Sequence, residues 1–412
     1  MKRVYNKLGE EVYDHKNSND WYCPRFFDHV YTHTNGHYAA CCIADSTSTP
    51  RIDQANPSEW FHSDYMDNLR RASLNPKAKG SKEILYESCY RCMNQERDYS
   101  TSYRMESVAS LEDADEVLRA TKIYQQKGKA TLLPNLLSVQ LRMFGNTCNL
   151  DCYMCQPQGS SIRERTIKDN NYREHVAFDR DMYIKPKFTV DMLDGIDEIS
   201  MSIRTILLQG GEPLYIKNQF KMLDRLIELG VSKNISIEMN SNMTILGVSN
   251  LNIMDYLDEF KGLSVQASID GYGKYNDYIR RRSKWKDVTS NIETMRRKSK
   301  VSMSIFSTFS LLSLLRFDLL QDWALKEDLE ISTFIVDDPP ELNPRHLPDP
   351  IKEELMYKHS DDRNIVECLR RDRDPKSFVN ALNYIIKTDK IYGTDVFELY
   401  PELKPYYDEE CK

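Results

Sequence analysis

The sequence predicts an α/β protein: a partial (β/α)6 TIM-like barrel with a small N-terminal metal-cluster module and a helical C-terminal tail. Two observations lead to this fold class. From about residue 136 to residue 345, short β-rich runs alternate with amphipathic stretches, which is typical of βα units around a parallel sheet. The first hundred residues instead combine grouped cysteines with few periodic apolar runs, and such a loop-rich unit often needs a metal to hold it together.

Six strands make up the predicted barrel. We expect them at residues 137–144, 205–209, 235–240, 263–269, 301–309 and 331–336. Amphipathic helices are expected between them, for example at 219–229 and 287–298. Six repeats fit a partial barrel better than a closed eight-fold one, which needs more chain. The polar stretch 156–187 is long for a βα loop, and the chain after residue 348 is charged and mainly helical.

Four segments follow from this pattern. Residues 1–105 form the metal-cluster module, 106–135 a charged helical connection, 136–345 the partial barrel and 346–412 a helical C-terminal extension. Within the first segment, Asn35-Gly36 predicts a hairpin between strand-like runs at 27–32 and 38–43. One helix, at 60–73, is expected between Cys42 and Cys89.

Composition and charge restrict the function. The 412 residues include 56 basic and 63 acidic ones, which gives a net charge of −7. A nucleic-acid partner is therefore not expected, because proteins that bind phosphates usually carry a basic excess. No run approaches the ~18 apolar residues that a membrane helix needs. The basic N-terminus lacks the apolar stretch of a signal peptide, so we expect a cytoplasmic protein that acts away from membranes.

The ten cysteines are grouped, most tightly at Cys148, Cys152 and Cys155. In a reducing compartment such groups are metal-binding or catalytic, and thiolates suit both iron–sulfur clusters and zinc. Three thiolates can bind three irons of a cubane and leave the fourth open, whereas structural sites are closed by four ligands. The triplet follows the strand expected at 137–144, where barrel active sites are built. A zinc site completed by a distant His or Cys is the alternative interpretation.

The spacing Cys148-x3-Cys152-x2-Cys155, with Tyr153 just after the second cysteine, resembles the signature of the radical S-adenosylmethionine superfamily. The resemblance implies a 4Fe–4S cluster whose open iron binds the amino and carboxylate groups of S-adenosyl-L-methionine. It also implies the reaction. One electron, from a reductant such as flavodoxin or ferredoxin, cleaves this cofactor to a 5′-deoxyadenosyl radical, which abstracts a hydrogen from the substrate.

A glycine-rich loop falls in the order that this family shows. Gly210-Gly211-Glu212-Pro213 follows the second expected strand and is similar to the family's GGEP loop, which binds the methionine amine. Glycines let a backbone approach a ligand closely, and a carboxylate suits an ammonium group. An ordinary turn is the alternative for the isolated tetrapeptide.

Polar residues also end the third and fourth expected strands. Asn242 lies in a polar turn at 240–242, and Ser268 opens a Ser-Ile-Asp-Gly turn that resembles the family's Ser-x-Asp-Gly. The arginines that follow resemble a family Arg that meets the methionine carboxylate. Arg280 is the one we select, with 281 and 282 left open. The resemblance spans about residues 136–340, half of the chain.

A second set of cysteines lies near the N-terminus: Cys23, Cys42, Cys89 and Cys92. Four thiolates close a site, which fits either structural zinc or a permanently coordinated 4Fe–4S cluster. The surrounding residues resemble the SPASM or twitch auxiliary-cluster module, here in front of the barrel as in a variant group. They are Trp21 to Pro24, the Asn35-Gly36 hairpin, Cys41-Cys42, Cys89-x2-Cys92-x3-Glu96 and Ser102 to Arg104.

The module's resemblance implies one auxiliary 4Fe–4S cluster, with Cys42 favoured over Cys41 because the second cysteine is the usual ligand in the variant pattern. The resulting hypothesis is a radical enzyme that modifies a peptide, protein or small-molecule substrate. Two alternatives stay open. One is an interaction protein whose zinc or iron–sulfur sites are both structural. The other is a radical enzyme acting on a nucleobase, which only the arginine run supports.

Overall fold

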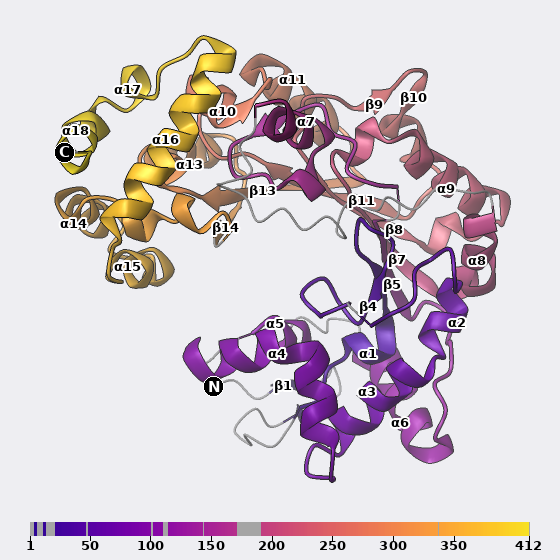
Figure 1. The fold of residues 1–412 in the computed structure, drawn as a ribbon. Coiled ribbons are helices and arrows are strands. Elements are labelled where there is room, and N and C mark those ends of the chain that lie inside the picture. The colour runs from indigo at the N-terminus through magenta and orange to yellow at the C-terminus, as the bar shows by residue number, and fades with distance from the viewer. Residues whose placement is uncertain are drawn as a thin grey trace.

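Figure 1 shows the computed structural model of the chain. It describes residues 4–5, 11–13, 21–46, 48–99, 102–109, 114–142, 144–170, 191–336 and 338–411. Residues 171–187 of the predicted polar stretch 156–187 therefore lie outside the described residues. None of the described helices combines the length and apolar character that a bilayer crossing requires.

A large sheet lies at the centre of the described chain. Its order is β14-β13-β11-β8-β7-β5-β3-β4, and every neighbouring pair is parallel except β3 with β4. The strands are β3 (His29–Thr32), β4 (Tyr38–Ala39), β5 (Leu137–Leu141), β7 (Ile203–Leu208), β8 (Ser236–Ser241), β11 (Gly262–Ser268), β13 (Val301–Phe309) and β14 (Ile331–Ile335). The six predicted barrel strands and the α/β partial-barrel fold class are confirmed.

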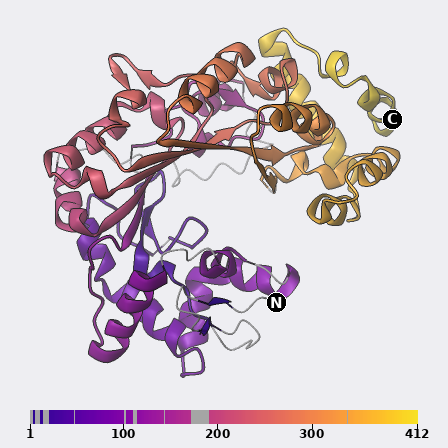
Figure 2. The same cartoon turned by 180° about the vertical axis from the view of Figure 1, so that it is seen from behind.

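The two faces of the sheet differ in polarity. In β11, Leu263, Val265 and Ala267 are buried, whereas Ser264 is exposed and Gln266 half-buried. This period of two sends apolar side chains to one face and polar ones to the other. The connecting helices α8 (Asp191–Ile199), α9 (Lys217–Glu228), α11 (Trp285–Arg296) and α13 (Phe317–Lys326) cover the outside of the curved sheet (Figures 1 and 2). The inner face, on the side away from these four helices, is the polar one.

The N-terminal part adds to this sheet. β3 pairs with β5 in parallel, and Gly36, at φ 85°, closes the predicted hairpin to β4. The strand expected to begin at residue 27 begins at His29, because Phe27 and Asp28 donate their amides to the Pro24 carbonyl in a helical turn. The segment boundaries near residues 105, 135 and 345 stay predictions.

The helix predicted at 60–73 is two helices, and a third was missed. α2 (Pro57–Phe61) and α3 (Asp64–Leu74) are separate because Asn56 and Ser63 each cap a new N-terminus. α4 (Ser81–Tyr99) carries Cys89 and Cys92. This helix was not predicted because its mostly polar sequence has no helical repeat of apolar residues. The helices α1 (Arg25–Asp28), α5 (Tyr103–Ala109) and α6 (Ala114–Lys127) complete this part.

The C-terminal extension is helical, as predicted. It contains α14 (Asp349–Lys358), α15 (Arg363–Leu369), α16 (Pro375–Tyr392), α17 (Val396–Leu399) and α18 (Lys404–Glu410). α16 starts with an Asp374 cap followed by proline and ends at Gly393 in the left-handed conformation, which favours glycine. Phe378, Leu382 and Ile385 of α16 are buried, so this helix is part of the core.

The remaining elements are short. They are α7 (Ser161–Asp169), α10 (Lys274–Ile279), α12 (Leu311–Leu314), the pair β1 (Val4–Tyr5) with β2 (Glu11–Tyr13), the pair β9 (Gly247–Val248) with β10 (Leu251–Asn252), and the pair β6 (Asp151–Cys152) with β12 (Arg280–Arg281). The last pair matters for the site, because it joins the cysteine loop after β5 to the segment after β11.

Candidate active site

The predicted cysteine triplet lies in the loop between β5 and α7. Cys148 and Cys152 are buried and Cys155 is half-buried. All three line one cavity of about 290 Å3 at the carboxyl ends of the barrel strands. Predicted residues from three other strand ends line the same cavity: Gly210, Gly211, Glu212, Asn242, Ser268 and Arg280. Parallel strands end at the same edge of a sheet, which is why residues far apart in sequence meet there.

The loop after β7 packs closely against the cysteine loop at its two glycines. A Cβ atom on Gly211 would lie 2.3 Å from the Thr147 carbonyl oxygen, so only glycine fits this position. The Glu212 amide donates to that same carbonyl at 2.9 Å. Thr147 precedes Cys148, and this contact therefore places the first cysteine beside the end of β7.

Glu212 connects two strand ends. Its buried carboxylate accepts hydrogen bonds from the Ser241 hydroxyl at 2.9 Å and from the Asn242 amide at 2.8 Å. Burial raises the pKa of Glu212 to about 7, and the hydrogen bonds from the backbone and Ser241 oppose that rise. The side chain is thus a buried acid at the cavity wall, with donors already on both oxygens.

The structure separates the three arginines that the sequence left open. The Arg280 guanidinium lines the cavity and pairs with Asp270, with 2.7 Å between Nε and Oδ2. Arg281 is buried on the other side of β12, where it pairs with Asp389. Arg282 is exposed. Arg280 is the arginine at the cavity, and the run is no continuous basic patch.

Two predicted residues lie outside the cavity lining. Tyr153 points away from it, and its hydroxyl donates to the Asp389 carboxylate at 2.9 Å. The neighbouring Met154 lines the cavity in its place. Pro213 is buried behind Glu212 at the start of a short 3-10 turn. The expectation that Tyr153 and Pro213 contact the cofactor through their side chains therefore has no support in this geometry.

The chemistry of the three thiols fits a cluster. Burial raises the pKa of Cys148 to about 12 and of Cys155 to about 11, and it raises the pKa of Cys152 as well. Buried thiols of this kind ionise when a cationic metal centre binds them. Arg280 lowers the pKa of Cys152 by its charge, against the larger effect of burial. Within the described part of the chain, no three His, Cys, Asp or Glu side chains are placed so that they could hold a single metal ion.

The second set of cysteines surrounds another, much smaller cavity. Cys23, Cys41, Cys89 and Cys92 line about 20 Å3 of space between the start of the N-terminal part and α4. The selection of Cys42 finds no support here. Cys42 lies outside this lining, and its thiol contacts the Tyr103 hydroxyl. The turn after β4, closed by the Ala44 amide on the Cys41 carbonyl at 3.2 Å, directs the first cysteine of the pair to the cavity.

The motifs predicted around these cysteines form one unit. Arg104 binds the Glu96 carboxylate with two nitrogens, at 2.9 and 2.6 Å, and donates to the Tyr22 carbonyl at 3.1 Å. The Ser102 hydroxyl donates to the same carboxylate at 2.5 Å. The Arg104 amide and the Ser102 hydroxyl also contact the Cys92 thiol. Arg104 therefore ties the residues before Cys23 to those after Cys92.

We expect Glu96→Gln to lower the free energy of unfolding by about 2 kcal/mol, because hydrogen bonds to a charged partner contribute about 1.5–3 kcal/mol. Denaturant titration of the cluster-free chain measures this. Glu293→Gln, at an exposed i,i+4 pair with Arg297, is the control and should change stability by less than about 0.5 kcal/mol. Equal effects of the two substitutions would contradict the role of Glu96.

Sequence reasoning missed a row of side-chain amides on the inner face of the sheet. Gln140 donates to Gln209, Gln209 to Asn240 at 3.4 Å, and Asn240 to Gln266 at 3.2 Å. Gln209 and Asn240 also line the cavity of the cysteine triplet. The signal for this amide row was present in the sequence as glutamines and an asparagine at polar positions of apolar strands.

Comparison with known proteins agrees with the site. Residues 143–311, which include the cysteine loop and the strands β7 to β13, match the family described as "Radical SAM superfamily". This match covers less than half of the chain. No curated protein shows significant similarity to the chain.

Two groups of solved structures are similar at low identity. Native anSMEcpe with bound AdoMet shares 15% identity and a TM-score of 0.36, over 63% of this chain and 62% of that one. Streptococcus suis SuiB bound to S-adenosylmethionine shares 11% identity and a TM-score of 0.33, over 84% of this chain and 69% of that one. The chain thus spans 62% of the length of the anSMEcpe structure. At these scores the likeness carries no argument about substrate or reaction.

Proposed function

We propose that this chain is a radical enzyme that binds a 4Fe–4S cluster through Cys148, Cys152 and Cys155 and cleaves S-adenosylmethionine reductively. One observation carries the proposal: the three thiols of the triplet, a glycine-carboxylate loop and an inward arginine surround a single cavity at the ends of four strands. No fourth thiol lines that cavity among the described residues, which leaves the open iron that the chemistry needs.

When bound, the cluster supplies the electron that breaks the sulfur–C5′ bond of the cofactor, releasing methionine and a 5′-deoxyadenosyl radical that takes a hydrogen atom from the substrate. The protein's own groups orient the cofactor. Arg280 supplies a positive charge for its carboxylate. The Gly210-Gly211 backbone and Glu212 form a wall suited to its ammonium group, and Asn242 and Ser268 add polar groups at the neighbouring strand ends.

The N-terminal cysteines would hold a second 4Fe–4S cluster, closed by four thiolates, that relays electrons or binds substrate. The small cavity that Cys23, Cys41, Cys89 and Cys92 all line supports this, because four thiolates are the number that closes such a site. Its lining also includes Trp21, Phe26 and Leu85, and a low-dielectric shell is one of the features that tune cluster potential. A flavodoxin or ferredoxin is the class of reductant that we propose for the chain.

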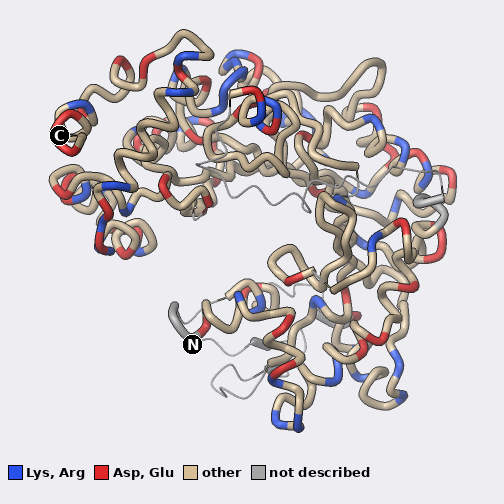
Figure 3. Tube along the Cα trace, in the orientation of Figure 1, with Lys and Arg blue, Asp and Glu red and all other residues tan. Residues whose placement is uncertain are grey.

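The inner face of the barrel supports a substrate recognised by hydrogen bonds, such as a peptide, a protein segment or a polar small molecule. The amide row runs across this face from the cluster cavity, and Ser264, Ser302 and Ser332 continue the polar surface. Figure 3 shows that charged residues gather on the outer helices, whereas the central strands are largely uncharged. The arginine run gives little support to a nucleobase substrate, because only Arg280 lines the cavity, whereas Arg281 pairs with Asp389 and Arg282 is exposed.

Anaerobic reconstitution tests the proposal. The protein loaded with iron and sulfide should hold about eight irons, two cubanes, and should release 5′-deoxyadenosine from S-adenosylmethionine when dithionite is added. A fully loaded protein that releases none would reject the radical function. Zinc in protein purified without oxygen, with no broad visible absorbance, would favour the structural alternative instead.

Glu212→Gln should weaken S-adenosylmethionine binding by about 10- to 100-fold, because the variant loses a charge at the wall proposed for the ammonium group. Gln keeps one oxygen to accept from Ser241 or Asn242, so the fold should survive. Equilibrium dialysis against the reconstituted protein measures the affinity. Glu228→Gln, on the exposed side of α9, is the matched control, and equal affinities in the two variants would contradict the assignment.

A further inference from the structure

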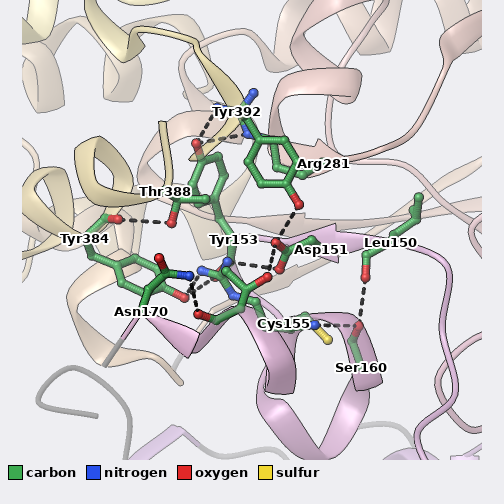
Figure 4. A network of polar contacts seen from close by, with 12 residues as sticks. Leu150, Asp151, Tyr153, Cys155, Ser160, Asn170, Arg281, Tyr384, Thr388 and Tyr392 are labelled. Carbon is green, nitrogen blue, oxygen red and sulfur yellow. Dashed lines mark hydrogen bonds and ion pairs between the residues drawn. The ribbon is translucent and has the colours of Figure 1, made fainter. Parts of the chain in front are cut away.

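The C-terminal helix α16 contacts both neighbours of Cys152. Tyr153, which follows it, donates its hydroxyl to Asp389 at 2.9 Å. Asp151, which precedes it, accepts from the Tyr392 hydroxyl at 2.7 Å. Figure 4 shows Tyr392 above Asp151, with Tyr384 and Thr388 of the same helix beside Tyr153. The central cysteine of the triplet therefore lies between two residues that one distant helix holds.

The main chain at this point is fixed as well. The Tyr153 carbonyl accepts from the Tyr384 hydroxyl at 3.3 Å, and the Tyr153 amide donates to the Ile279 carbonyl at 3.2 Å. On the other side, Asp151 binds Arg163 at 3.0 Å and the Thr166 hydroxyl at 2.8 Å. These bonds leave the backbone around Cys152 little freedom to shift.

Asp389 also holds the strand opposite the cysteine. β6 pairs with β12 so that Cys152 lies opposite Arg280, and the next residue, Arg281, pairs with Asp389. Tyr278 adds its hydroxyl to the same carboxylate at 2.8 Å. A single carboxylate of α16 thus fixes both the segment that carries Cys152 and the segment that carries Arg280.

This network is buried and charged. Asp389 is 3% exposed, and Asp151 and Arg163 are each 0% exposed. Buried ion pairs are weak evidence for added stability, because apolar residues of similar volume often serve as well. Their effect is on geometry, because a polar network whose groups are all hydrogen-bonded holds its members in one arrangement. The arrangement held here is that of a cluster ligand relative to the cavity arginine.

We propose that α16 is a positioning element of the cluster site, and that Asp389 and Tyr392 act through Tyr153 and Asp151 to set the place of Cys152 relative to Arg280. Only the effect of this positioning on the cluster rests on the proposed function. It assigns a role to the C-terminal extension that no motif in its sequence indicates.

Alkylation of the cluster-free chain tests the positioning directly. Iodoacetamide labelling, followed by peptide mass spectrometry, gives a separate rate for each cysteine. In Tyr153→Phe and Tyr392→Phe, we expect Cys152 to be labelled about tenfold faster than in the wild type, because loss of one hydrogen bond to a charged group favours local opening. The buried Cys368, which contacts Asn343, should keep its rate.

Tyr407→Phe is the matched control, since it removes a tyrosine hydroxyl from Asn383 of α16 on a face that contacts α18. Cys152 should be labelled in this variant at the wild-type rate. Equal labelling of Cys152 in Tyr392→Phe and Tyr407→Phe would overturn the proposal. A parallel rise at Cys368 would also overturn it, because that result indicates global loosening.

A second readout uses the loaded protein. The electron paramagnetic resonance signal of the reduced cluster should change on addition of S-adenosylmethionine in the wild type, and that change should be smaller in Asp389→Asn and Tyr153→Phe. In the double variant this spectral change should be as small as in the more affected single variant, because both substitutions remove the same contact between Tyr153 and Asp389. If the wild-type signal never responds to S-adenosylmethionine, the proposed function fails, while the labelling rates still decide the role of α16.

Discussion

Cys152→Ala is expected to abolish S-adenosylmethionine cleavage and to remove one of two clusters. Cys152 is the central ligand of the triplet, and its loss leaves two thiols, too few to hold three irons of a cubane. The N-terminal set lies around a separate cavity and should keep its iron. Iron per chain should therefore fall from about eight to about four, and 5′-deoxyadenosine should fall by at least about 1,000-fold, to background.

Cys368→Ala separates this effect from the loss of any buried thiol. Cys368 is buried and contacts Asn343 in the C-terminal part, far along the chain from either cysteine set. Its variant should keep both the iron content and the cleavage activity. If Cys152→Ala retains about eight irons, the triplet is not the ligand set, and the proposed radical site is rejected.

The sequence was informative where local pattern and the geometry of the fold agree. The strands β5, β8 and β11 have apolar residues at alternate positions, and β7, β8 and β11 each end in a polar or glycine-rich turn. In a parallel sheet those turns share one edge, so Gly211, Asn242 and Ser268 could be placed together before any coordinates existed. The structure places all three in the lining of one cavity.

Side-chain direction was the harder question. Tyr153 follows a cluster cysteine in sequence, but its hydroxyl partner, Asp389, is 236 positions away. No local pattern encodes that contact. For α16 the sequence indicated only a charged, mainly helical part of the chain, and nothing in it distinguished the buried Tyr384 and Asp389 from residues exposed to solvent.

The N-terminal part shows the same limit. Its cysteines could be grouped from spacing, but β3 joins the barrel sheet through backbone pairing with β5, which side-chain periodicity does not specify. Cys41 and Cys42 are adjacent, and neighbouring side chains in an extended chain point to opposite sides. Which of them faces Cys23 and Cys89 depends on the turn that follows β4, and the sequence alone left the choice to resemblance.

Cys41→Ala is expected to remove the N-terminal cluster, whereas Cys42→Ala is expected to keep it. Cys41 lines the small cavity with Cys23, Cys89 and Cys92. Burial raises the pKa of its thiol, and the charges of the nearby Cys42, Cys89 and Cys23 add to that rise. Cys42 is not part of that lining, and its thiol contacts the hydroxyl of Tyr103, which is part of it. Iron should fall from about eight to about four per chain in the first variant and stay near eight in the second.

The cleavage assay makes this comparison sharper. The triplet is intact in both variants, so each should still release 5′-deoxyadenosine when dithionite supplies the electron directly. Loss of iron in Cys42→Ala, with full iron in Cys41→Ala, would show that the turn after β4 directs the other cysteine to the cluster. Full iron in both single variants, with loss only in the double variant, would mean that either neighbour can bind. That outcome would contradict a unique ligand at this turn, because adjacent thiols can exchange places only if the backbone between Ala40 and Ala44 rearranges.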